Sequence, residues 1–79
     1  MSSSIVNLYK AQKNKMFTVS SVPDIGLLEN LGVREGTRIS LQNRYALGGP
    51  VVLRIENAYS VALGKDVAGL ITVTDASVA

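Results

Sequence analysis

The segment NRYALGGPVVLRIEN, residues 43–57, joins a tight turn to a strand. Gly48 and Gly49 allow backbone angles that a side chain would forbid, and Pro50 fixes φ where the next segment begins. After the proline, apolar and polar residues alternate, which is typical of a half-buried strand. The apolar face consists of Val51, Leu53 and Ile55. We therefore expect a loop that folds two strands back on each other, with Gly49 at positive φ.

The same alternation recurs along the chain and predicts further strands. These are MFTVSSV (16–22), TRISLQNR (37–44), AYSVALG (58–64) and LITVTD (70–75). DIGLLENLG (24–32) is expected to form a short helix and GKDVAG (64–69) a helical turn. The residues expected to point inward are Phe17, Val19, Ile39, Leu41, Tyr59, Val61, Leu63, Ile71 and Val73.

Each predicted strand has one apolar face, so the strands must bend around a shared interior. The sequence predicts a mostly β fold, a small antiparallel barrel of about five strands. A short helix follows the first strand and a helical turn precedes the last. Gly32 and Gly36 are expected at turns that end the helix and its connection.

The chain has 79 residues, which favours one domain. Residues 1–15 contain three consecutive serines and three lysines and are expected to form a flexible or partly helical N-terminal arm. Residues 16–75 would form the folded domain and residues 76–79 a C-terminal tail. No run of about 18 apolar residues and no secretory signal is present, so we expect no insertion into a membrane.

The composition argues against several classes of function. The chain has no cysteine and no histidine, which excludes disulfides, thiolate metal sites and imidazole bases. The six acidic residues form no paired motif, and LGGP is not a phosphate-binding loop. We expect no catalytic, cofactor-binding or metal-ligating residues and no enzyme activity. A net charge of +2 argues against a dedicated nucleic-acid binder.

Three blocks in order suggest a family: LLENLGVREGTRISL, RYALGGPVVLRI and YSVALGKDVAGLITV. They resemble the ferrous iron transport protein A (FeoA) family over about residues 16–73. The matching positions are Leu28, Leu31, Gly32, Gly36, Leu47, Gly48, Gly49, Pro50, Ala62, Leu63, Ala68, Ile71 and Val73. The sequence departs from the family at Glu35 and Ala46, where proline is common, and at Gly64, where a basic residue is common.

The resemblance implies an SH3-like barrel in a small cytoplasmic accessory protein of ferrous iron transport. Its partner would be the GTPase-containing cytoplasmic part of the transporter FeoB, which it would regulate or assemble. The family domain also resembles the SH3-like domain of metal-dependent repressors, which leaves binding to nucleic acid or a repressor as the alternative. Family members are described as binding transition metals. Here Fe²⁺ would find only carboxylates and carbonyls as ligands.

An adaptor needs an exposed contact surface, and two segments qualify. Leu27 should face outward from the short helix, because its neighbours Ile25, Leu28 and Leu31 share the inner face. The loop after the second predicted strand carries Arg44, Tyr45 and Leu47, and tyrosine and arginine are enriched at binding hot spots. We expect Leu27, Arg44, Tyr45 and Leu47 to contribute to one docking patch.

Overall fold

The computed structural model describes residues 5–75. Within this range six strands form one antiparallel sheet in the order β1-β6-β2-β3-β4-β5. The strands are β1 (Ile5–Asn7), β2 (Met16–Ser21), β3 (Arg38–Arg44), β4 (Val51–Ile55), β5 (Tyr59–Leu63) and β6 (Thr72–Asp75). The helices are a 3-10 helix, η1 (Leu8–Lys10), and two short α-helices, α1 (Gly26–Asn30) and α2 (Lys65–Ala68).

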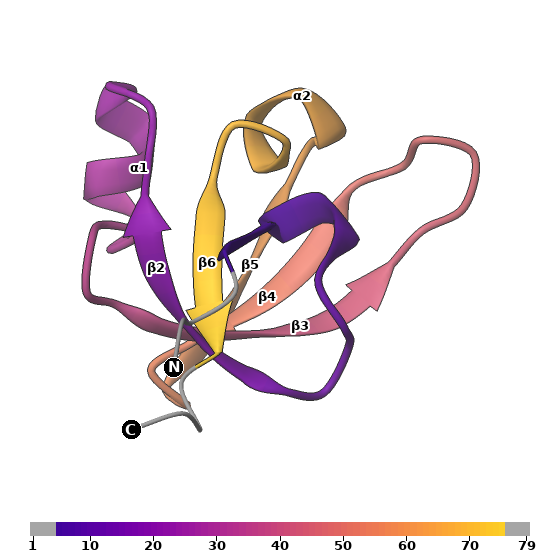
Figure 1. Ribbon diagram of the computed structural model, residues 1–79. Coiled ribbons are helices and arrows are strands. Elements are labelled where there is room, and N and C mark those ends of the chain that lie inside the picture. Colours follow the sequence, from indigo (N-terminus) through magenta and orange to yellow (C-terminus); the bar gives the residue numbers. More distant parts are fainter. Residues whose placement is uncertain (1–4, 76–79) are drawn as a thin grey trace.

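The mostly β, SH3-like class expected from the sequence is confirmed. Figure 1 shows a strongly bent sheet, with α1 beside β2 at one side and α2 at the top, near the end of β6. The ring of strands is not closed, because β1 and β5 remain the two edges of the sheet within residues 5–75. The strand count also differs from the expected five, since the N-terminal segment contributes β1.

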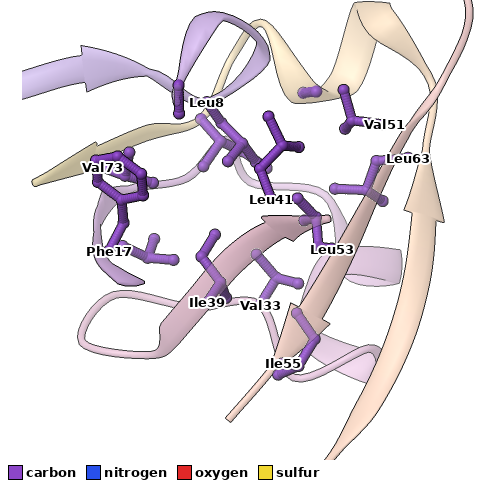
Figure 2. Close-up of a cluster of buried hydrophobic side chains, with 14 of the residues drawn as sticks. Leu8, Phe17, Val33, Ile39, Leu41, Val51, Leu53, Ile55, Leu63 and Val73 are labelled. Atoms are coloured by element: carbon purple, nitrogen blue, oxygen red, sulfur yellow. The ribbon is translucent and has the colours of Figure 1, made fainter. Parts of the chain in front are cut away.

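The core lies on the concave side of the sheet (Figure 2). The alternation of β4 is reproduced: Val51, Leu53 and Ile55 are buried, while Val52 and Arg54 are partly exposed. Leu28 contributes from α1, and Ala68 from α2. Tyr59 does not point inward as expected. Its side chain is 44% exposed, and its hydroxyl donates to the Leu31 carbonyl at 2.6 Å.

The N-terminal segment is part of the packed fold from Ile5 onward, which differs from the expected arm. β1 pairs with β6, and the Leu8 amide donates to the Ile71 carbonyl at 2.8 Å. Leu8 and Ala11 are buried in the core. η1 agrees with the partly helical alternative. β1 has only three residues, too few to show a strand alternation, so the sequence pattern did not indicate it. Residues 1–4 and the expected tail, residues 76–79, lie outside the described residues.

The turn after β4 and the end of α1 both depend on left-handed residues. Glu56 and Asn57 have φ of 54° and 59°, and the Ala58 amide closes this turn on the Ile55 carbonyl at 2.9 Å. Gly32 has a φ of 84°, and a Cβ at this position would overlap the Tyr59 hydroxyl. Glycine is therefore favoured at position 32 by its backbone angle, and a side chain there would displace the Tyr59 hydroxyl.

The loop between β3 and β4 differs in one detail from expectation. Gly48 has a φ of 75°, but Gly49 is not among the residues with positive φ. Gly49 is constrained by space instead, because a Cβ there would lie 2.9 Å from the Tyr45 Cβ and 3.2 Å from the Ala46 carbonyl oxygen. Among the other expected turn glycines, Gly36 has a positive φ of 90°.

The burial of Leu8 makes a direct prediction about stability. Replacing Leu8 by alanine should lower the free energy of unfolding by about 2–5 kcal/mol, because it leaves a cavity under the sheet. The control is Ile5→Ala, at a side chain that is 63% exposed and should cost much less. Urea unfolding of both variants measures the difference. Equal stability of the two variants would contradict the packing of the N-terminal segment.

Candidate docking surfaces

The titratable residues of the described chain do not gather into a reactive centre. Within residues 5–75, no group of three or more carboxylates could hold a metal ion, and the sequence supplies no histidine or cysteine. Asp75 forms an ion pair with Lys15 at 2.7 Å. No helix in the described part is long and apolar enough to cross a membrane. The candidate sites are therefore the surfaces on which apolar side chains are exposed.

The same donor chemistry sets an expectation for iron. Isolated carboxylates and carbonyls make a weak site for Fe²⁺ compared with imidazole or thiolate ligands. Anaerobic calorimetry with Fe²⁺ should therefore detect no stoichiometric site of micromolar affinity in the isolated chain. A saturable site of that strength would show that metal binding is a property of this protein.

The first surface is the loop between β3 and β4, residues 45–49, which we call the β3–β4 tip. The Gly49 amide donates to the Ala46 carbonyl at 3.2 Å, and the Tyr45 amide donates to the Pro50 carbonyl at 3.0 Å. Leu47 and Gly48 between them have φ of 61° and 75°, the pattern of a type I′ turn. Figure 1 shows this loop projecting away from the body of the sheet.

Leu47 is the unusual residue of the β3–β4 tip. Its side chain is fully exposed, and a left-handed backbone costs an ordinary side chain about 1–2 kcal/mol. Asparagine or glycine normally occupies the central positions of such turns. Tyr45 is also exposed, at 51%. The tip thus holds an apolar side chain in water on a strained backbone, and burial within residues 5–75 does not offset the strain.

This strain predicts that Leu47→Asn stabilises the protein. Asparagine tolerates the left-handed region, so the free energy of unfolding should rise by about 1 kcal/mol and the melting temperature by about 4–8 °C. Thermal unfolding followed by circular dichroism measures the shift. Leu27→Asn is the control, because α1 gives that position ordinary helical angles. A fall in melting temperature for Leu47→Asn would show that the leucine stabilises the tip.

Tyr9 of η1 connects the tip to the N-terminal segment. Its hydroxyl donates to the Gly49 carbonyl at 3.1 Å. Two cations lie near its ring, with the Arg44 guanidinium carbon 5.9 Å and the Lys65 ammonium 5.7 Å from the ring centre. Such distances allow cation–π attraction. Through Tyr9, η1 therefore contacts both the tip and α2 at one end of the molecule.

Arg44 has an internal role that the sequence did not indicate. Its Nε donates to the Tyr9 carbonyl at 2.6 Å, and its Nη2 donates to the Ala11 carbonyl. The guanidinium therefore joins the end of β3 to the N-terminal segment. As a contact residue for a partner, Arg44 would have to act through its charge while keeping these hydrogen bonds.

The second surface surrounds α1. A groove of about 300 Å³ lies between α1 and the segments on either side of it. It is lined by Val22, Pro23, Asp24, Ile25, Leu28, Glu29, Val33 and Arg34. Leu27, on the same helix but outside this lining, is 57% exposed. We call the groove together with Leu27 the α1 surface.

The structure does not bring the four predicted contact residues into one patch. Figure 1 places α1 and the β3–β4 tip on opposite sides of the molecule, with β6 and β2 between them. Tyr45 and Leu47 share the tip with Arg44 at its base, whereas Leu27 lies at the other end. The four residues therefore divide between two separate surfaces, and their contribution to a contact stays a prediction.

The sequence matches the FeoA domain family over residues 6–75, almost the whole described range. This chain belongs to the FeoA family. The FeoA match includes β1 and η1, in agreement with the packed N-terminal segment. No sequence match was found among curated proteins.

Solved structures agree on the fold. An iron uptake regulatory protein (FeoA) superposes with a TM-score of 0.80 at 21% identity, over 90% of this chain and 96% of that one. A FeoA-like protein from Clostridium acetobutylicum superposes with a TM-score of 0.76 at 24% identity. The match covers 96% of this chain and 91% of that one. A manganese-dependent transcriptional repressor superposes with a TM-score of 0.82 at 20% identity, and the match covers 95% of this chain. This FeoA domain spans only 44% of the length of that repressor.

Two functional candidates at the tip were missed by sequence reasoning. Tyr9 lies in the segment expected to be an arm, and Lys65 lies in a helical turn that was considered only for its fold. The contact of Lys65 with Tyr9 and the hydrogen bond of Tyr9 to Gly49 join positions far apart in the chain. Such contacts leave no periodic signal in a single sequence.

Proposed function

We propose that this chain is a cytoplasmic, non-enzymatic accessory protein of ferrous iron transport. It would bind the GTPase-containing cytoplasmic part of a FeoB-like transporter and regulate or assemble it. The observation that carries the proposal is the FeoA family match over residues 6–75. The groove beside α1, with Leu27 exposed next to it, supports a role in binding, since concave surfaces with accessible apolar groups are typical of contact sites.

The α1 surface is the better candidate for this partner. The groove can receive a side chain of the partner, and the exposed Leu27 beside it can enter a pocket on the partner's surface. Asp24, Glu29 and Arg34 at the rim would set the orientation, as polar rims do in other interfaces. A domain of this size offers a modest area, so the contact should be transient, in the class that buries less than about 1,200 Å².

The test measures binding of the transporter's soluble GTPase domain by the full chain and by folded variants. Leu27→Glu should weaken binding at least tenfold, because it places a charge in an apolar contact. Leu47→Asn and Tyr45→Ala, at the opposite end, should bind like the wild type. Circular dichroism confirms the folding of each variant.

Three outcomes of this experiment are informative. Loss of binding in Leu47→Asn or Tyr45→Ala, with Leu27→Glu unaffected, would move the docking site to the tip. Unchanged binding by all three variants would exclude both surfaces. Failure of the wild-type chain to bind would overturn the proposal itself.

A second candidate function is favoured by the manganese-dependent repressor, which superposes on 95% of this chain with a TM-score of 0.82. A domain of this shape could associate with a repressor or with nucleic acid. Binding to duplex DNA at low salt that falls steeply as salt is raised would support this second function, because phosphate contacts release counterions.

A further inference from the structure

The β3–β4 tip combines an exposed apolar point with a cluster of cations. Leu47 is fully exposed and Tyr45 is half exposed. The Lys65 side chain reaches this loop, since its Nζ lies 4.0 Å from the place where a Cβ on Gly48 would be. Lys10 is exposed in η1, directly after Tyr9, whose hydroxyl binds the Gly49 carbonyl. Arg44 stands at the base of the loop.

Among the described residues, the cations at this end outnumber the acids. Among residues 5–75, no carboxylate forms a salt bridge with Lys10, Arg44 or Lys65. The acid adjacent in sequence is Asp66, in the first turn of α2. Three other acids, Asp24, Glu29 and Glu35, belong to α1 and the segments flanking it. Three cations therefore lie around the tip with one acid, Asp66, whereas three acids lie around α1 with one cation, Arg34.

We propose that the β3–β4 tip is a reversible anchor for an anionic membrane surface. Leu47 would enter the boundary between headgroups and acyl chains, with the Tyr45 ring at headgroup level. Lys10 and Lys65 would face the anionic headgroups, and Arg44 would add charge while it keeps its hydrogen bonds to the Tyr9 and Ala11 carbonyls. Lysine side chains suit this position because their stems are apolar and their heads remain hydrated.

The shape of the tip favours a bilayer over a folded protein partner. Stable protein interfaces bury about 800 Å² on each side, which a single projecting turn cannot supply. A fluid bilayer surface instead closes around a convex group. Leu47 is also held at positive φ while its side chain stays fully exposed among residues 5–75. A leucine in this position is explained if its side chain is buried in a bilayer.

This inference does not depend on the proposed function, and its test needs no transporter. The full chain is mixed with vesicles of phosphatidylcholine containing phosphatidylglycerol, or with phosphatidylcholine alone, and the bound fraction is measured by co-sedimentation. We expect binding to the anionic vesicles, little binding to the neutral ones, and a marked loss at high salt because the surface charge is screened.

Two variants separate the apolar contribution to vesicle binding from the electrostatic contribution. Leu47→Asn should lower the partition coefficient about tenfold or more, since a leucine side chain no longer leaves water. Lys65→Gln should lower it about fivefold, the effect of one lysine near an anionic surface. Leu27→Asn is the matched control, an exposed leucine among acids at the other end, and should bind like the wild type. Because Leu47→Asn should be at least as stable as the wild type, its loss of binding cannot be ascribed to unfolding.

A fluorescence experiment shows which side chain enters the bilayer. The chain has no tryptophan, so Leu47→Trp and Leu27→Trp each carry a single reporter. Anionic vesicles should shift the emission of Leu47→Trp to shorter wavelength and leave that of Leu27→Trp unchanged. Absence of vesicle binding at low salt, equal binding by Leu47→Asn, or a shift confined to Leu27→Trp would each overturn the proposal. Loss of transporter binding in Leu47→Asn without any vesicle binding would assign the tip to a protein partner instead.

Discussion

A sheet that is apolar on one side can exclude water from that side only if it bends around itself and its open end is filled. This constraint organises the whole domain, because the chain has no disulfide to hold the sheet in place. β2, β3, β4 and β6 supply the walls, and α1 contributes Leu28. Val33, Leu63, Ala68 and Ile71 also belong to this core, together with Leu8 and Ala11 from the first residues of the described chain. Burial of these two side chains completes a core that the strands alone leave open.

The packing of Leu8 also positions its neighbours in the chain. η1 brings Tyr9 against the loop between β3 and β4, and Arg44 then binds the carbonyls of Tyr9 and Ala11. The tip is therefore supported by the same segment that closes the core. The α1 surface is instead supported by Tyr59, whose hydroxyl holds the Leu31 carbonyl at the end of α1. Each of the two exposed surfaces has its own support within the fold.

Most of the fold could be predicted from the sequence because most of its elements repeat a period. β4 alternates strictly, and Gly32 and Asn57 occupy left-handed positions that their residue types favour. The predictions failed for residues whose position is set by a single contact and not by a repeating pattern. Leu8 is buried by a single turn, Tyr59 faces outward to reach a carbonyl on α1, and Gly49 is limited by contact with Tyr45 rather than by its φ. The separation of Leu27 from Leu47 depends on the path of the whole sheet, which no local pattern records.

The pairing of β1 with β6 determines where the chain enters and leaves the domain. Ile5 lies opposite Thr74, and Cα atoms of residues opposite each other on antiparallel strands are about 4.5–5.5 Å apart. A short linker could therefore join the two ends, and a circular permutant could be opened at the exposed turn of Glu56 and Asn57 without breaking a strand. Segments that precede Ile5 and follow Asp75 leave the described domain at one place, so a fusion on either side should leave the α1 surface and the β3–β4 tip equally accessible.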